Sequence, residues 1–132
     1  MIFVFKVIWL HRFSPELDPD EVRDWWLNHH GALALRARGL RRYIQNHWMD
    51  PIEETGQRAF DGHVDAWFDS EEAFYETMAS PEWQALIEDG PGGFDPDTLT
   101  PHLIGAPVAE HIMRWDALPD RRAYRASGPT TR

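Results

Sequence analysis

The stretch RDWWLNHHGALALRARGLRRYIQNH, residues 23–47, places two tryptophans, two adjacent histidines and a third histidine within one expected helix-to-strand unit. Its first part repeats apolar side chains at spacings of three and four, which is typical of one helix face. That face is expected to carry Val22, Trp25, Trp26, His29, Leu33 and Arg36. We expect the helix to begin with Asp18 as N-cap and Pro19 in its first turn, and to end at Gly39. Residues 40–49 then alternate between two sets of side chains, which predicts a strand.

The other strand patterns complete a β-α-β-β-α-β order. Short runs of β-branched and aromatic residues predict strands over residues 2–10, 60–69 and 107–115. This order is that of the split βαβ unit, in which the helices cover one face of a four-stranded antiparallel sheet. The sequence therefore predicts an α+β, ferredoxin-like fold.

A second helical segment is expected between the third and fourth predicted strands. Asp69 or Ser70 is its expected cap, with Glu72 in a capping-box arrangement. Ser80, which precedes a proline, is expected to restart a short helix. Residues 90–101 are rich in glycine, proline and aspartate, which predicts a loop.

Length and composition limit the class of protein. The chain has 132 residues, of which 42% are hydrophobic, enough for one folded domain, expected over residues 1–115 with a mobile extension over 116–132. A net charge of -9 argues against a nucleic-acid partner. The absence of cysteine excludes disulfides and thiol nucleophiles and fits a reducing compartment. The apolar first ten residues contain an early lysine and are too short to span a membrane, so a cytoplasmic protein without a membrane partner is expected.

One face of the predicted sheet has no helix to cover it. Its side chains are expected to include Phe3, Phe5 and Trp9, or the residues that alternate with them. Because a large apolar face of this kind needs a partner, we expect a two-fold homodimer in which two sheets pack together.

Two histidines and one aspartate are the candidate catalytic residues. His30 lies four residues after Trp26, so the two are expected to share a helix face. His47 shares a strand face with Tyr43 and Gln45, a polar row that a purely structural core strand would avoid.

Asp65 lies between apolar residues of the third predicted strand. A buried carboxylate within reach of His30 or His47 would orient the imidazole and raise its basicity. We therefore expect His30, His47 and Asp65 to form the catalytic group. His63, on the same predicted face as Asp65, is an alternative partner, and His29 is expected at the surface.

The sequence favours a site without a metal ion or cofactor. Adjacent histidines such as His29 and His30 splay about 100° apart on a helix and cannot chelate one ion together. The chain has no HExxH pattern and no glycine-rich phosphate loop, so neither a catalytic metal nor a nucleotide cofactor is expected.

Seven tryptophans exceed what a small core normally needs. We expect some of them to line a slot for a flat aromatic substrate by stacking. The expected substrate-binding residues are Trp26, Tyr43, Trp48, Trp67 and His111.

Several short segments, in this order, resemble the EthD family of the dimeric α+β barrel superfamily. They are WLNHHGAL, GLRRYIQNH, FDGHVDAWFDS, SPEW and AEHI, which together cover residues 2–115. The resemblance implies a ferredoxin-like protomer, a barrel-forming dimer and a pocket between the helices and the sheet. His30 is the position that matches the helix histidine of the family, and some relatives bind haem, for which His30 or His111 would be the axial ligand.

The expected function is that of a cofactor-independent lyase or isomerase with histidine general acid-base chemistry. Its expected substrate is a small hydrophobic, aromatic polyketide-like or lactone-like molecule, because the resemblance implies decarboxylases, dehydratases and lactone isomerases among the relatives. A cofactor-free or haem-dependent monooxygenase and a non-catalytic binder of a pathway intermediate are the alternatives, since one fold hosts several chemistries.

Overall fold

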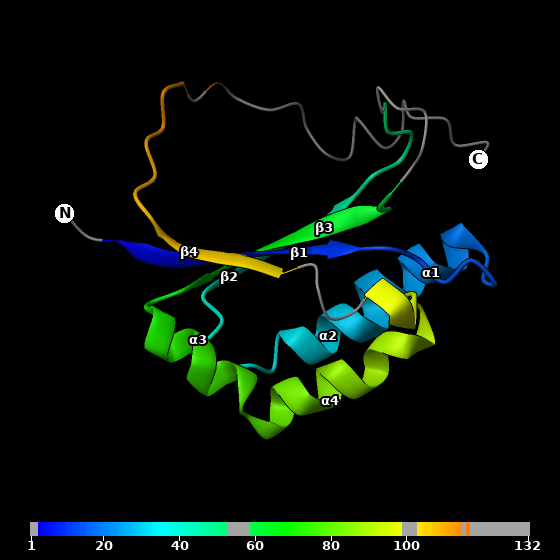
Figure 1. The fold of residues 1–132 in the computed structure, drawn as a ribbon, viewed down its shortest axis with the longest axis horizontal. Helices are drawn as coiled ribbons and strands as arrows, with labels where there is room; N and C mark the ends of the chain where they lie inside the picture. The colour runs from blue at the N-terminus through cyan, green and yellow to red at the C-terminus, as the bar shows by residue number, and fades with distance from the viewer. Residues whose placement is uncertain (1–2, 53–58, 99–102, 115, 117–132) are drawn as a thin grey trace.

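The four strands form one antiparallel sheet in the order β2-β3-β1-β4, with the helices packed against one of its faces (Figure 1). The computed structural model describes residues 3–52, 59–98, 103–114 and 116. The sheet order and the single helical layer confirm the predicted ferredoxin-like α+β fold. The predicted C-terminal extension lies, apart from Asp116, outside the described residues.

The strands are β1 (Val4–His11), β2 (Arg42–His47), β3 (Gly62–Phe68) and β4 (Leu103–Val108). The helical elements are α1 (Pro19–Trp25), η1 (Trp26–His30), α2 (Gly31–Ala34), α3 (Glu71–Met78), α4 (Pro81–Asp89), η2 (Gly90–Gly92) and η3 (Pro96–Thr98). Within the described ranges, no helix has the length and apolar character that crossing a membrane requires.

The helices begin where side-chain acceptors satisfy their first free N–H groups. Asp18 and Ser80 each accept a hydrogen bond from the backbone N–H three residues further on, and each is followed by a proline. Ser70 does the same for the Ala73 N–H at 3.0 Å. Ala73, not Glu72, is thus the third residue of α3, so the predicted capping box does not form.

The first helical segment contains one wide turn. In η1 the Gly31 N–H bonds to the carbonyl of Trp26, five residues back, instead of four. Trp26 and His30 at the two ends of this turn are buried, whereas His29 is exposed. The predicted helix face was therefore wrong in including His29.

The chain leaves the helical conformation earlier than predicted. The helix α2 ends at Ala34, and i→i+3 hydrogen bonds such as Ala37 N–H to Ala34 carbonyl carry the chain through tight turns. Small Ala34 and Ala37 pack there against Trp83. Gly39 does not cap the helix. A Cβ at Gly39 would lie 2.0 Å from the Thr77 hydroxyl oxygen, so the close contact with α3 requires glycine at this position.

The fourth strand is not where the sequence predicted it. The prediction was residues 107–115, but β4 is Leu103–Val108, paired with β1 from Trp9 opposite Leu103 to Val4 opposite Val108. Pro107 lies inside β4, which is possible because an edge strand has one row of unpaired N–H groups and tolerates a proline there. His111 consequently lies beyond the strand and is exposed.

Alternation along β1 divides its side chains between two environments. Phe5 and Trp9 pack under the helices, with ring centroids 5.4 Å from Phe74 and 5.3 Å from Trp83, respectively. Their alternates, including Lys6 and Ile8, lie on the face without helices, which we call the open face.

Gly62 is a point of close approach in the core. A Cβ at this position would lie 2.5 Å from the Asn46 carbonyl oxygen and 2.8 Å from Cη2 of the fully buried Trp26.

Since a backbone oxygen cannot rotate away, Gly62→Ala should lower the free energy of unfolding by about 1–3 kcal/mol. Urea-induced unfolding followed by circular dichroism measures this. Gly92→Ala is the matched control, because its Cβ would make only ordinary contacts, the nearest at 3.5 Å. Equal unfolding midpoints for the two variants would contradict the steric argument.

Candidate functional site

Aromatic and imidazole rings fill the interior between η1 and the sheet. Trp26 is fully buried at the centre, and the His47 ring stacks on it with centroids 4.2 Å apart and planes 15° apart. His11 and Phe94 contact Trp26 edge-on at 5.4 and 5.6 Å. His30 meets the Phe94 ring edge-on at 5.2 Å. We call these five residues the Trp26 cluster and take it as the candidate active site.

His30 is held by a carboxylate from the end of α4. Its Nδ1 lies 3.0 Å from Oδ2 of Asp89, whose other oxygen lies 3.0 Å from Nε2 of His29. Because a carboxylate only accepts, the His30 Nδ1 carries the proton and Nε2 is the basic nitrogen. Burial lowers the pKa of His30, and the hydrogen bond and charge of Asp89 oppose this only in part. His30 is therefore a neutral imidazole at pH 7, oriented as a base.

His47 is fixed in the opposite tautomer by Gln45. The Gln45 amide nitrogen donates to the Trp26 carbonyl at 2.8 Å and to the Tyr43 hydroxyl at 3.2 Å. The Gln45 carbonyl oxygen lies 2.8 Å from the His47 Nε2 and can only accept a hydrogen bond, so Nε2 carries the proton and donates it. The lone pair of the imidazole is then on Nδ1. The pKa of His47 is lowered by burial and by the positive charge of Arg23.

His11 is a member of the cluster that the sequence analysis missed. It stacks on Phe94 with ring centroids 4.0 Å apart, and burial, with the neighbouring His30 and His63, lowers its pKa to about 3. The alternation that puts Phe5 and Trp9 toward the helices reaches His11 as well. Extending the first predicted strand by one residue would have found it.

Asp65 is not near the candidate histidines. On β3 it pairs with Ile44, so it lies on the open face, whereas His47 pairs with Gly62 and faces the helices. The predicted group of His30, His47 and Asp65 is thus not brought together, because adjacent strand residues alternate between the two faces. The carboxylate that orients His30 is Asp89, at the end of α4, which the sequence did not single out.

Asp65 is instead the centre of a polar network on the open face. Its carboxylate accepts from the Asn46 amide at 3.0 Å and lies 3.3 Å from Nε2 of His63 and 3.6 Å from Nζ of Lys6. Nδ1 of His63 accepts in turn from the Trp48 indole at 3.0 Å. The sequence analysis named His63 as the alternative partner of Asp65, and the structure places the two side by side.

The predicted substrate-binding residues separate into two groups. Trp26 and Tyr43 lie with His47 on the helix side. Trp48 and Trp67 lie on the open face. Nζ of Lys6 and Cζ of Arg42 lie over the Trp67 ring, 4.7 and 4.6 Å from its centroid. Together with the exposed position of His111, this rules out a single slot lined by all five side chains.

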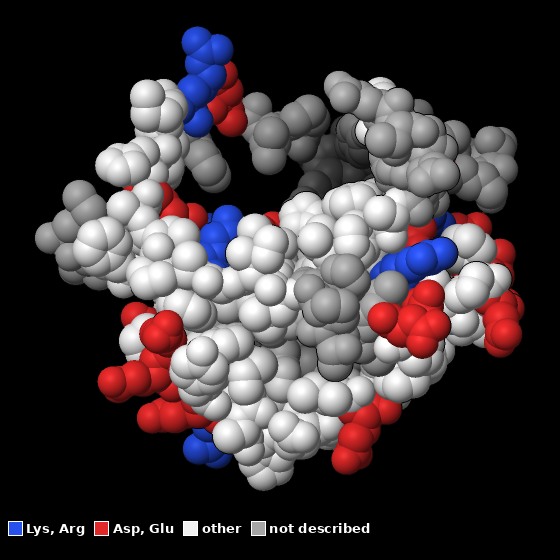
Figure 2. Space-filling model, in the orientation of Figure 1, with Lys and Arg blue, Asp and Glu red and all other residues white. Residues whose placement is uncertain are grey.

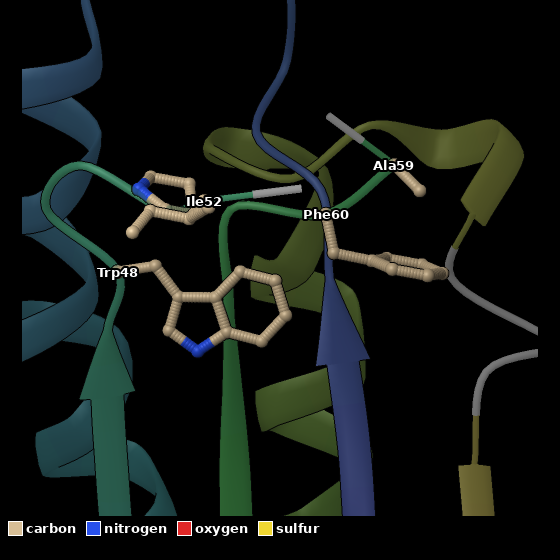
Figure 3. A pocket seen from close by; sticks show the side chains of 5 residues that line it. Trp48, Ile52, Ala59 and Phe60 are labelled. Atoms are coloured by element: carbon tan, nitrogen blue, oxygen red, sulfur yellow. The ribbon is translucent and has the colours of Figure 1, made fainter. Parts of the chain in front are cut away.

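A cavity of about 430 Å³ lies on the open face at the end of β2 and β3. Its lining residues are Trp48, Pro51, Ile52, Ala59 and Phe60. Figure 3 shows the Trp48 indole and the Phe60 ring in front of the strands, with the helices behind. This cavity is therefore on the opposite side of the sheet from the Trp26 cluster.

Charge is concentrated outside the candidate site. Figure 2 shows acidic side chains over the helical layer and a largely uncharged surface between them. Among the residues that the structure describes, no three or more His, Asp or Glu side chains are arranged to hold a metal ion. The chemistry available to the Trp26 cluster from its own side chains is thus proton transfer by imidazole in an apolar environment.

The half-buried His11 should make the fold sensitive to acid. Its pKa is about 3 in the folded protein and near 6.5 in an unfolded chain, so the unfolded state binds more protons between these values. The stabilisation is complete above pH 6.5 and is lost as the pH falls, by about 1.4 kcal/mol per pH unit. In His11→Phe, which keeps the ring stack, urea unfolding at several pH values should show a shallower loss between pH 6.5 and 4. An unchanged slope would contradict this assignment.

Comparisons with known proteins agree with this fold. The family model described as the EthD domain matches residues 14–97. An EthD-like protein from Ralstonia eutropha JMP134 superimposes with a TM-score of 0.63 at 18% identity, covering 86% of this chain and 100% of that one. An EthD family protein from Bacillus halodurans gives a TM-score of 0.57 at 18% identity, with coverages of 83% and 100%.

A third structure, a dimeric ferredoxin-like protein of unknown function from Thermobifida fusca, gives a TM-score of 0.55 at 20% identity, covering 83% of this chain and 93% of that one. No match was found among the curated proteins. At these identities the structural likeness shows the fold, while the domain match spans more than half of the 132 residues and includes η1, β2, β3 and α4. The chain belongs to the EthD family.

Proposed function

We propose that this protein is a cofactor-independent enzyme that moves protons on a small hydrophobic, ring-bearing carbonyl compound, as a lyase or an isomerase. The observation that supports this most is the buried His30, a neutral imidazole that is bonded through Nδ1 to the half-buried Asp89 and packed against the rings of Trp25 and Phe94. Family membership and the related folds support a role in small-molecule binding or catalysis without specifying the reaction.

In the proposed mechanism, Nε2 of His30 takes a proton from the carbon next to a carbonyl group. The imidazolium that forms is stabilised by the Asp89 carboxylate on Nδ1, as in other His–carboxylate pairs. The same nitrogen then returns the proton to another atom of the substrate. Positioned proton transfer of this type contributes typically 10²–10⁴-fold to the rate.

The surroundings of His30 favour an enolate-like intermediate and an apolar substrate. Phe94 and Trp25 contact the imidazole, with the Trp25 ring centroid 4.8 Å away, so little water competes for the basic nitrogen. Aromatic walls suit a flat ring system. Decarboxylation, dehydration and isomerisation all pass through an enolate-like species, so the proposal is limited to this class.

The decisive variant is His30→Asn. The Asn amide can replace Nδ1–H in the bond to Asp89, but it has no base at the position of Nε2. Hydrogen–deuterium exchange of the acidic C–H groups of 2-tetralone and 3-isochromanone, a two-ring ketone and lactone, can be followed by NMR in D₂O. We expect wild-type protein to accelerate this exchange and His30→Asn to lose about 10²-fold or more of the acceleration.

His29→Asn is the matched control, because His29 bonds to the same carboxylate from outside and is 62% exposed. It should keep the wild-type exchange rate. Equal rates for wild-type protein and His30→Asn would refute His30 as the base, and binding of the probes without any exchange would favour a non-catalytic binder. Stoichiometric oxygen consumption on turnover would favour an oxygenase.

We further propose that the protein is a homodimer assembled through the open face. Apolar side chains on this face include Ile8, Ile44 and Ile104, the last of which is 63% exposed in the protomer. The Thermobifida fusca structure with the same fold is a dimer, which supports the proposal.

Ile104→Glu should weaken this dimer, because it places an unpaired charge in an apolar contact. Ile87→Glu is the matched control, since Ile87 is similarly exposed, at 52%, but lies on α4 in the helical layer. Sedimentation velocity at micromolar concentration should show a dimer for wild-type protein and Ile87→Glu and mainly monomer for Ile104→Glu. A monomeric wild-type protein, or a dimer that Ile104→Glu leaves intact, would refute the proposed interface.

A further inference from the structure

Two buried donor groups near His47 have no acceptor among the residues that the structure describes. Among the described residues, the buried side-chain nitrogens without a hydrogen-bond partner are Nε of Arg23 and Nε1 of Trp26. Trp26 has no exposed surface at all. A buried N–H without an acceptor costs about 1–3 kcal/mol, so such a group calls for an explanation.

The Trp26 indole N–H lies beside the hydroxyl of Tyr43. It approaches the hydroxyl oxygen closely enough to lower the pKa of Tyr43, in opposition to the larger effect of burial, but it is not aligned well enough for a hydrogen bond. The hydroxyl oxygen already accepts from the Gln45 amide at 3.2 Å, and no described group accepts a hydrogen bond from it. The Trp26 N–H and the Tyr43 O–H thus lie near each other, and neither has a well-aligned acceptor among the described residues.

Both donors are held rigidly in place. Gln45 bonds at the same time to the Tyr43 hydroxyl and to the Trp26 carbonyl, and so fixes the strand side chain relative to the helix. The Trp26 carbonyl accepts both the Gly31 N–H within η1 and the Gln45 amide, one hydrogen bond on each lone pair. The absence of a side chain at Gly31 gives the amide room, because a Cβ there would lie 2.6 Å from the Gln45 Nε2.

The surroundings favour an anionic oxygen as the missing acceptor. The Arg23 guanidinium is near enough to lower the pKa of His47, and the His47 ring covers one face of Trp26. Tyr43, Gln45 and His47 are half-buried on β2, which is an edge strand of the sheet, so each of these side chains keeps some exposed surface.

We propose that the Trp26 indole N–H and the Tyr43 hydroxyl form an oxyanion-binding subsite that holds the enolate or phenolate oxygen of a ring-bearing ligand. This inference rests on the proposed function for the identity of the ligand class, and it adds the residues that bind its oxygen. Preorganised donors in a dry site stabilise developing negative charge without reorganisation. Trp26 and Tyr43 therefore contact the ligand, while Gln45 is a positioning residue.

The test measures binding, so it does not require turnover. The probes are 2-naphthol, the more acidic 6-cyano-2-naphthol, and 2-methoxynaphthalene, which has the same ring system but cannot supply an oxyanion. Each is titrated into ¹⁵N-labelled full-length protein while the assigned Trp26 indole resonance is followed. We expect this proton to move downfield with both naphthols, further with the more acidic one, and to stay in place with 2-methoxynaphthalene.

Tyr43→Phe removes one hydroxyl and should weaken binding of 6-cyano-2-naphthol about tenfold, since a hydrogen bond to a charged group is lost. Tyr75→Phe is the matched control, because Tyr75 is 62% exposed on α3 and should leave the affinity unchanged. Equal affinity for naphthols and 2-methoxynaphthalene, no effect of Tyr43→Phe, an unmoved Trp26 resonance or no naphthol binding would each overturn the subsite. If wild-type protein binds the naphthols but does not accelerate hydrogen–deuterium exchange of 2-tetralone or 3-isochromanone, only the enzymatic proposal is refuted.

Discussion

The wide turn over residues 26–30 is the constraint on which the candidate site depends. In a regular helix the Trp26 carbonyl would accept the N–H of His30, four residues further on. Here it accepts the N–H of Gly31, which adds one residue to the turn. Trp26 and His30 are both buried around this turn, and Gln45 ties the helix to β2 through a second hydrogen bond to the same carbonyl. Wide turns of this kind are frequent at functional sites.

Burial around this turn determines the state of the histidines. His11, His30 and His47 all have a lowered pKa, and desolvation is the largest cause for each. Of these three, His30 is the one that contacts a carboxylate among the described residues, the half-buried Asp89. Neutral imidazoles packed among rings are suited to accept protons from a weakly acidic carbon, because no charge has to be buried before the reaction begins.

The two faces of the sheet have different physical tasks. The helix side contains rings, neutral imidazoles and unsatisfied donors. The open face contains a network of paired charges and hydrogen bonds around Asp65, next to exposed isoleucines. The network satisfies its own polar groups, which is a requirement for any polar surface that another protomer would cover. The separation follows from the alternation of β2 and β3, whose neighbouring residues point to opposite sides.

Periodicity and capping residues were sufficient to predict the order of strands and helices and the side of β2 that carries His47. They also predicted that helices start after Asp18, Ser70 and Ser80. These features depend on neighbours in the chain. The position of β4 could not be predicted, since an edge strand is defined by its pairing with β1. The sequence predicted that His30 shares the face of Trp26, but it could not show that Asp89 lies beside it. Residues 59 positions apart meet only when α4 packs against the helix that carries His30. Local pattern decided the elements and the face of His30, whereas the packing of α4 on that helix decided which carboxylate orients the imidazole.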